Sequence, residues 1–360
     1  MTSPVISSPL RASSPVDNRE KVGLKRRASK SPERARKRRA SPSASRPLTA
    51  HGATDPPGST GVNERKRRRR RGGLLPSDDS DSSVSGSTVP TDAREVFNLK
   101  YWEGALVGKG GFGSVFRGFR RSDYLPVAIK HIRLGATKPN SVMVNGRRIP
   151  LEVALMLVLG SGGGTSGVVA LLDWYELRDE LILVMERPLP CTDLMAYLQS
   201  RRCSLEESEA KSIMKQLVDT LITIQSKGVL HRDLKPDNIL VRPSPHGPRV
   251  SIVDFGCGTM PMGKKLKTGP GTRPYTCPEW IRSGCYRAEP LTVWQLGVVM
   301  YLMFHPHFPF NGATEIISKD AGVREDLSSD CKDFLQGCLC KRPNSRSSLQ
   351  TLKDHPWIQI

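Results

Sequence analysis

Hydrophobic and polar positions follow a strand-like pattern between residues 100 and 190. Short runs of β-branched and other apolar residues alternate there with glycine-rich turns, which is typical of paired strands. The runs are GALVGKGGFGSVFRGF, LPVAIKHIRL, GVVALLDWYEL and ELILVME. One segment, IPLEVALMLVLG, instead has helical spacing, and Pro150 suits the first turn of a helix.

After residue 191 the apolar spacing becomes helical. The expected helices contain DLMAYLQ, SLEESEAKSIMKQLVDTLITIQSKG, LTVWQLGVVMYLMF and SSDCKDFLQGCL, with Ser204 as a cap of the second. A strand-rich part followed by a helix-rich part predicts an α+β fold with two lobes. We expect the boundaries at residues 97–185, a connecting hinge at 186–190, and a helical lobe at 191–360.

Residues 1–96 differ from the rest in composition and are expected to form a disordered tail. They are rich in Ser, Pro, Arg and Gly, and residues 1–90 hold 20 Lys and Arg against 8 Asp and Glu. Two basic clusters occupy residues 25–39 and 65–71, which suits nuclear import, a nucleic-acid-binding arm or a solvated charge run. No aromatic residue interleaves the charges, so we expect no specific nucleic-acid partner. The clusters also make Ser29 and Ser41 candidate phosphorylation sites.

Cysteine use and hydropathy indicate a soluble intracellular protein. The eight cysteines all follow residue 190 and contain no CxxC pair, so free thiols are expected rather than disulfides or a zinc site. The N-terminus, MTSPVISSPL, lacks the features of a secretory signal, and no stretch approaches the ~20 apolar residues of a membrane helix. We expect a monomer in the cytoplasm and the nucleus, without a membrane partner.

The first motif with chemical content is G-x-G-x-x-G-x-V, at residues 108–115. Its glycines, Gly108, Gly110 and Gly113, would let the backbone approach phosphate groups closely, and Val115 would cover a base. A purely structural hairpin explains the motif equally well. A strand follows the glycines rather than a helix, which excludes the dinucleotide-binding fingerprint.

Lys130 and Glu152 form a second candidate pair. Lys130 ends the next expected strand, and Glu152 opens the expected helix in an otherwise apolar sequence. A carboxylate at that position can hold the ammonium group against the oxygens of a triphosphate.

The third and fourth motifs, HRDLKPDNIL and VDFG, favour phosphoryl transfer. Asp233 can orient an attacking hydroxyl, Lys235 can neutralise the transferred group, and Asn238 and Asp254 offer oxygen ligands suited to Mg²⁺. Together, the four motifs in this order make a merely structural origin improbable.

Residues 97–360 therefore resemble the eukaryotic protein kinases. The resemblance implies ATP and Mg²⁺ in a cleft between the lobes, Thr272 bonded to Asp233 and Lys235, and an ion pair of Glu279 with Arg346. It also implies a nucleotide site formed by Val107, Gly108, Gly110, Gly111, Phe112, Gly113, Val115, Ala128, Lys130, Met185, Glu186, Pro188, Asp193 and Leu240.

Within the kinases, the chain is similar to the Pim family. The similar segments are NGRRIPLEV, ERPLPCTDL, GTRPYTCPEWIR, VWQLGVVMY and HPWIQ. This resemblance implies a serine/threonine kinase that prefers substrates with basic residues upstream and is active without activation-loop phosphorylation. A requirement for phosphorylation at Thr259, Thr268 or Tyr275, read by Arg232, stays an alternative.

Several positions depart from the family pattern. Leu189 and residues 311–313 replace acidic family positions, and Lys264, Lys265 and Lys267 would repel a basic peptide. Asp193 and Asp237 stay as candidate acidic contacts, so we expect basic-directed selectivity that is retained but weakened.

The hinge carries a proline where most kinases offer an N–H to adenine. Met185 would guard the back of the pocket and the Glu186 carbonyl would accept one hydrogen bond, whereas Pro188 has no N–H to donate. We therefore expect a single hinge hydrogen bond to ATP.

Two other classes of function fit the sequence less well. A catalytically inactive scaffold would lack Lys130, Asp233 or Asp254, and all three are present. A chromatin- or RNA-binding protein would need a reading module, and the sequence contains no recognisable one.

Overall fold

The computed structural model describes residues 92–134 and 140–359. Nearly all of the expected tail, including both basic clusters, Ser29 and Ser41, lies outside the described residues. Within the described part, no helix is both long and apolar enough to span a bilayer.

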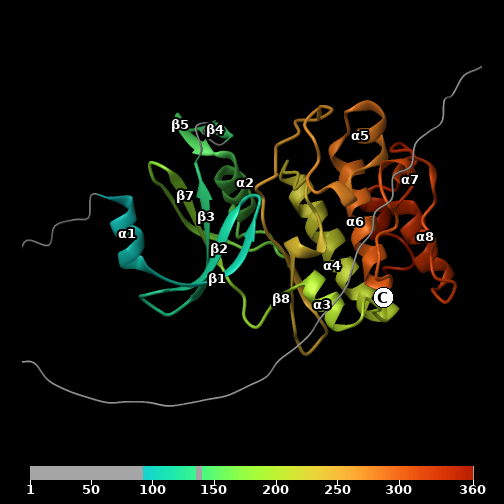
Figure 1. Ribbon diagram of the computed structural model, residues 1–360, viewed down its shortest axis with the longest axis horizontal. Helices are drawn as coiled ribbons and strands as arrows, with labels where there is room; N and C mark the ends of the chain where they lie inside the picture. Colours follow the sequence, from blue (N-terminus) through green and yellow to red (C-terminus); the bar gives the residue numbers. More distant parts are fainter. Residues whose placement is uncertain (1–91, 135–139, 360) are drawn as a thin grey trace, which may run out of the picture. The chain divides into compact units, whose positions relative to one another are not determined.

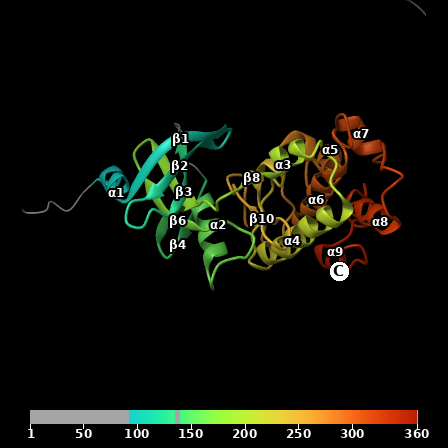
Figure 2. The same ribbon diagram turned by 90° about the horizontal axis from the view of Figure 1, so that it is seen from below.

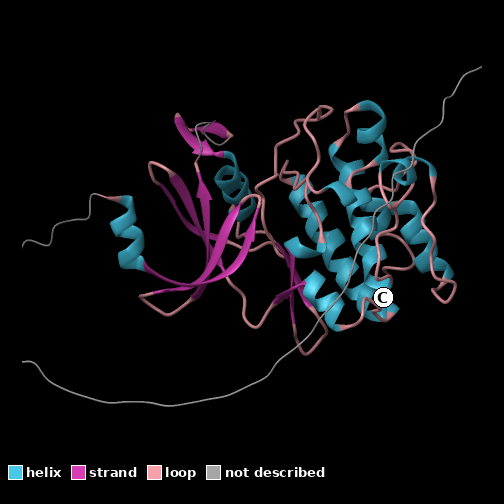
Figure 3. Ribbon diagram, viewed as in Figure 1, coloured by secondary structure: helices cyan, strands magenta, loops and turns pink. Residues whose placement is uncertain are grey.

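The strand-rich lobe contains a five-stranded antiparallel sheet of order β1-β2-β3-β7-β6 (Figures 1 and 3). Its strands are β1 (Tyr101–Gly110), β2 (Gly113–Arg120), β3 (Pro126–Arg133), β6 (Leu171–Glu176) and β7 (Glu180–Glu186). All four expected runs therefore contain strands. The alternation of side chains gives β7 two apolar faces, because Leu181 and Leu183 pack in one cluster while Ile182 and Val184 pack in another.

Helices cover the two faces of this sheet (Figures 1 and 2). Helix α2 (Leu151–Gly160) buries Val153 against Leu181 and Leu183. Helix α1 (Ala93–Lys100) buries Phe97 in the cluster that contains Ile182 and Val184. The pattern of strands did not predict α1, which spans the expected boundary between residues 96 and 97.

A short hairpin of β4 (Ser141–Val144) and β5 (Arg147–Pro150) leads directly into α2. Pro150 is the N-cap residue of α2, one position before the expected first turn, and no side chain caps the helix. The N–H of Leu151 donates instead to the Asn140 carbonyl at 2.7 Å, and Glu152 lies in the first turn of the helix.

The second lobe is mainly helical. Its helices are α3 (Leu194–Ser200), α4 (Glu207–Ser226), α5 (Pro278–Ser283), α6 (Ala288–Phe304), α7 (Ala313–Ser318), α8 (Ser329–Cys338) and α9 (Leu349–Lys353). Two 3₁₀ turns, η1 (Pro236–Asn238) and η2 (Arg273–Tyr275), lie in the loops, and a small sheet pairs β8 (Thr192–Asp193), β9 (Ile239–Arg242) and β10 (Arg249–Ile252). Helix α6 is buried at every position from Leu291 to Phe304, which makes it the centre of the lobe.

The prediction that Ser204 caps the second helix of this lobe is wrong. Helix α4 begins at Glu207, and its N-cap residue, Glu206, makes no side-chain cap. The hydroxyl of Ser204 instead accepts a hydrogen bond from Arg324 at 2.9 Å. The N–H of Leu205 donates to the Met303 carbonyl, so the chain here is tied to α6 before it turns into α4.

Candidate active site

Lys130 is the link between the two lobes at the centre of the site. Its Nζ donates to Glu152 Oε1 and to Asp254 Oδ1, both at 2.7 Å. Burial opposes the charge of this lysine, but attraction to the two carboxylates outweighs it and raises the pKa of Lys130. Burial likewise opposes ionisation of Asp254, yet Lys130 holds the pKa of that carboxyl below its ordinary value. Lys130 and Asp254 are therefore charged at neutral pH, whereas burial raises the pKa of the Glu152 carboxyl above its ordinary value against the attraction of Lys130.

Asp233 lies in the loop between α4 and η1 and is almost completely buried. Its Oδ1 accepts the Thr272 N–H at 2.7 Å, and its Oδ2 lies 3.0 Å from Lys235 Nζ but makes no hydrogen bond among the described residues. Lys235 Nζ donates to the Thr272 hydroxyl at 2.8 Å. The expected contact of Thr272 with Asp233 thus runs through the backbone. A carboxylate oxygen with spare accepting capacity can take a proton from a substrate hydroxyl.

Two neighbours that the sequence reasoning did not single out shape this loop. A Cβ at Gly271 would lie 2.2 Å from Asp233 Oδ1, so only glycine fits beside the carboxylate. His231 is buried, and burial lowers its pKa, so its ring is neutral. Its Nε2–H donates to Val253 C=O at 3.0 Å while Nδ1 accepts the Asp233 N–H at 3.2 Å. Its place at the start of the HRD motif was the available signal.

Asn238 and Asp254 retain oxygen atoms suited to a divalent cation. Asn238 Nδ2 donates to the Asp233 carbonyl at 2.9 Å, which fixes the amide and leaves Oδ1 to accept. The described residues contain no cluster of three or more His, Cys, Asp and Glu side chains that could hold a metal by themselves. One carboxylate and one amide suit a hard cation whose other ligands are phosphate oxygens and water.

The glycine-rich motif forms the turn between β1 and β2, and Gly108 pairs with Val115. Gly113 has φ of +131°, and a Cβ there would lie 2.3 Å from the His131 carbonyl, so the turn requires glycine. Gly108, Gly110 and Gly111 have open space around them, which leaves room for a ligand.

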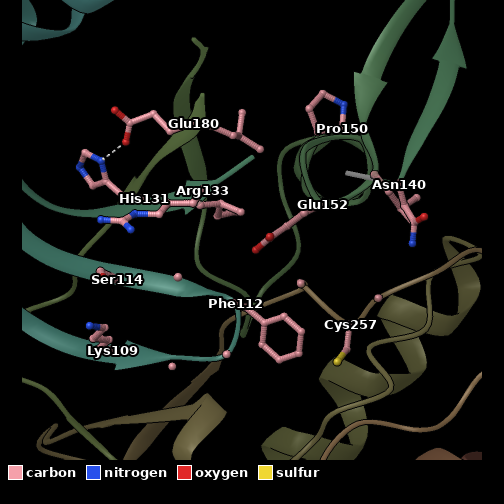
Figure 4. A pocket seen from close by; sticks show the side chains of 18 of the residues that line it. Lys109, Phe112, Ser114, His131, Arg133, Asn140, Pro150, Glu152, Glu180 and Cys257 are labelled. Atoms are coloured by element: carbon pink, nitrogen blue, oxygen red, sulfur yellow. Dashed lines mark hydrogen bonds and ion pairs between the residues drawn. The ribbon is translucent and has the colours of Figure 1, made fainter. Parts of the chain in front are cut away.

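Figure 4 shows the pocket on the α2 side of this turn. It has a volume of about 910 Å³, with Glu152 and Cys257 in its lining. Phe112 points into this space, and its ring lies so near Gly256 that a Cβ at Gly256 would be 3.1 Å from Phe112 Cγ. The tip of the glycine-rich turn therefore reaches the segment that follows Asp254.

The expected base-binding residues lie on paired strands of both lobes. Ala128 pairs with Met185, which is 7% exposed, and Leu240 pairs with Asp193. Val107 is exposed on β1. Asp193 Oδ1 also accepts the Ala196 N–H at 2.8 Å, so this residue caps α3 in addition to any contact with a ligand.

The hinge offers no free N–H from residue 186 to residue 188. The Glu186 N–H donates to Ala170 C=O at 3.0 Å and the Arg187 N–H donates to Pro126 C=O at 3.3 Å. Pro188 has none, and the Leu189–Pro190 peptide bond is cis. A ligand that needs a hinge donor finds none at these three positions.

Away from the cleft, Glu279 and Arg346 form the expected ion pair. Both carboxylate oxygens of Glu279 accept from the guanidinium at 2.9 Å, and both residues are buried. All eight cysteines are free thiols.

Comparisons with known proteins agree with this geometry. Residues 101–358 match the protein kinase domain family. The chain is 37% identical over 273 residues to serine/threonine-protein kinase pim-2 of Danio rerio, across 74% of this chain and 87% of that protein. It is 31% identical over 267 residues to serine/threonine-protein kinase prk-2 of Caenorhabditis elegans, across 73% of this chain and 59% of that protein. The chain therefore belongs to the protein kinase family, as a Pim-like serine/threonine kinase that uses ATP and a divalent metal and acts on protein substrates.

Proposed function

We propose that this kinase transfers the γ-phosphoryl group of Mg²⁺-bound ATP to Ser and Thr hydroxyls through the residues at the cleft. Asp233 Oδ2 orients the substrate hydroxyl and receives its proton as the oxygen bonds to the γ-phosphorus and the bond to ADP breaks. Lys235, held by Thr272, neutralises the charge that develops on the transferred group. The observation that carries this assignment is Asp233 Oδ2, which lies 3.0 Å from Lys235 Nζ and accepts no hydrogen bond among the described residues.

Lys130, kept in place by Glu152, is proposed to hold the α- and β-phosphates, with backbone N–H groups of the glycine-rich turn above them. Asn238 and Asp254 would hold the metal. A bound Mg²⁺ neutralises and orients the phosphate oxygens. The adenine ring would pack among Val107, Val115, Ala128, Met185 and Leu240, with one hydrogen bond to the Glu186 carbonyl.

Transfer of radiolabelled phosphate to a Ser peptide tests these roles. We expect Asp233→Asn and Asp254→Asn to lose at least about a hundredfold in kcat. Asp330→Asn, an exposed carboxylate on α8, is the matched control and should be unchanged. Equal rates for all three variants would contradict the assigned roles.

We further propose that the kinase is active without phosphorylation of its activation loop. Arg232 already donates to the hydroxyl of Thr268 at 2.9 Å and to three backbone carbonyls, those of Cys257, Thr268 and Gly269. Its Nε donates to the Tyr286 hydroxyl at 2.9 Å, which in turn donates to Thr268 C=O. The arginine that would read a phosphate is therefore satisfied by the loop itself.

Phosphatase treatment tests this second proposal. Treated protein, verified by mass spectrometry, should keep its kcat within about threefold. The hydrogen bonds that hold Arg232 to the activation loop go to neutral acceptors and do not need a phosphate. Thr268→Val, with exposed Thr314→Val as a control, should behave in the same way. Loss of activity on removal of a phosphate from Thr268 would contradict it.

The third proposal concerns substrates: weakened selectivity for basic residues upstream of the Ser or Thr. Asp237 is exposed beside Lys235, whereas Lys264, Lys265 and Lys267 are exposed on the activation loop. A single exposed carboxylate contributes about 1 kcal/mol or less, about fivefold in selectivity. We expect the ratio of rates between peptides with upstream Arg and with upstream Ala to fall by about fivefold in Asp237→Asn. The same ratio should be unchanged in Asp330→Asn. A strong multi-Arg preference unaffected by Asp237→Asn would count against it.

The basic clusters 25–39 and 65–71 support a proposal of cytoplasmic and nuclear localisation. Fluorescent fusions with either cluster neutralised should shift toward the cytoplasm; an unchanged distribution would argue against import by these clusters.

A further inference from the structure

The peptide groups on both sides of Asp233 are bonded to one side chain of α6. Gln295 Oε1 accepts the Leu234 N–H at 3.2 Å, and Gln295 Nε2 donates to the Arg232 carbonyl at 2.9 Å. Gln295 is 1% exposed, so neither bond competes with water.

The backbone at this point needs support. Arg232 has φ of +69°, in the left-handed region that a branched or long side chain adopts only at a cost of ~1–3 kcal/mol. The Asp233 N–H is bonded to His231. Together with the two bonds to Gln295, this contact fixes three of the backbone groups around the Asp233 side chain.

Helix α6 gives Gln295 a rigid base. The residues on either side of it, Trp294 and Leu296, are completely buried in the core of the lobe. An amide anchored on such a helix holds its partners with little freedom.

From these contacts we infer that Gln295 is a positioning residue for phosphoryl transfer, which clamps the peptide groups that flank Asp233 and so sets the direction of its carboxylate. The inference rests on the role proposed for Asp233. Within the described part of the chain, Lys130, Glu152 and the hinge form no hydrogen bond with Gln295, so we expect loss of the clamp to affect ATP binding less than the chemical step. A misplaced reactive group lowers the rate of the chemical step rather than ground-state binding.

The chain supplies a matched control in Gln216 of α4. Gln216 Nε2 donates to the carbonyls of Ser212 and Pro248, and its Oε1 accepts the Val250 N–H. It is therefore also a glutamine that clamps backbone groups, but those groups belong to α4 and the β9–β10 hairpin and not to the loop of Asp233.

The experiment compares Gln295→Met with Gln216→Met in the full chain, by thermal unfolding, by binding of ATP and by steady-state kinetics with a Ser peptide. Both variants should unfold at lower temperature. Gln295→Met alone should lose about tenfold or more in kcat, with the Kd of ATP within about twofold of the wild type. A Gln295→Met kcat within about twofold of the wild type, or an equal loss in Gln216→Met, would overturn the inference. An inactive wild-type chain would instead count against the proposed function.

Gln295→Glu provides a second, independent test should the methionine variant fold poorly. A protonated Glu can donate to the Arg232 carbonyl as the amide does, whereas an ionised Glu repels it. The ratio of kcat between Gln295→Glu and wild type should therefore rise as the pH falls. A ratio that stays near one across the pH range would overturn the clamp, because a merely structural role does not couple protonation of this residue to the chemical step.

Discussion

Two buried ion pairs, Lys130–Glu152 and Glu279–Arg346, connect segments that are far apart in the sequence, but they differ in what they leave unused. Arg346 donates to both carboxylate oxygens of Glu279 and to the Cys340 and Pro290 carbonyls. Both oxygens of the carboxylate and all three nitrogens of the guanidinium thus have partners inside the protein.

The pair at the cleft is less self-contained. Lys130 also reaches Asp254, a 26% exposed side chain whose Oδ1 is bonded while its other oxygen has no hydrogen bond among the described residues. Glu279–Arg346 thus stabilises the fold, whereas Lys130–Glu152, with Asp254, leaves a carboxylate oxygen available to a ligand. A buried charge retained with spare coordination is expected where ligands bind.

Breaking the Glu279–Arg346 pair should have the largest effect on stability. Arg346→Met leaves the Glu279 carboxylate buried without a cation, which we expect to cost about 3–5 kcal/mol in the free energy of unfolding. Urea denaturation measures it, with Arg342→Met, an exposed arginine in the same loop, as the control. A loss below about 1 kcal/mol would show that the pair contributes little.

Breaking the Lys130–Glu152 pair should instead affect catalysis. Lys130→Met removes the cation proposed to bind phosphate oxygens, and we expect kcat to fall by about a hundredfold or more. Its loss of stability should be smaller than that of Arg346→Met, because Glu152 beside the open cleft can take up a proton. Steady-state kinetics and urea denaturation on the same samples decide the point; a larger destabilisation than in Arg346→Met would contradict it.

Lys341 extends the comparison to a cation whose charged atom is buried and forms no ion pair among the described residues. Its Nζ makes no hydrogen bond among the described residues and lies 3.5 Å from the centre of the Phe310 ring. Burial lowers the pKa of Lys341 from 10.5 to about 8. The unfolded chain therefore binds more protons between these values, and this lysine makes stability rise with pH across that window.

Lys341→Met should accordingly stabilise the protein at neutral pH by about 1 kcal/mol, because it removes an unpartnered charge and keeps the apolar stem. The variant should also lose the rise in stability between about pH 8 and pH 10.5. Thermal unfolding at several pH values tests both effects. A destabilised variant would mean that the aromatic faces compensate the buried charge fully.

A similarly small effect is expected at the hinge, where a hydrogen-bond donor is missing. Pro188→Ala supplies an N–H at a position where the structure has none, worth about 0.5–1.5 kcal/mol, or up to about tenfold, for inhibitors that use two hinge hydrogen bonds. Inhibitors that use one should bind equally to both proteins. Calorimetry with one inhibitor of each kind checks this, and no gain for the first kind would refute the single-bond hinge.

The sequence was most informative where residue type and spacing carry chemistry. The four motifs by themselves predicted Lys130, Glu152, Asp233 and Asp254, because few residue types can bind phosphate, metal and a proton at those intervals. The alternation of apolar residues predicted all five strands of the large sheet. The boundary between the tail and the first lobe was harder to predict, because α1 is short and Phe97 is its one buried residue.

The clamp on Asp233 could not be predicted from spacing. Gln295 lies 62 residues from Asp233 in a helix that is apolar on all sides, where a single amide gives no periodic signal. Only the tertiary structure decides that its two polar atoms meet the peptide groups on either side of the carboxylate.

The sequence by itself thus determined which chemistry this kinase performs, since that depends on the kinds of side chain present. The tertiary structure decided how those side chains are held: which oxygen of Asp233 accepts no hydrogen bond from the described residues, and that Arg232 is satisfied without a phosphate. Hydrogen bonds between residues distant in sequence depend on distances of a few tenths of an ångström, and these arise only when the core has packed.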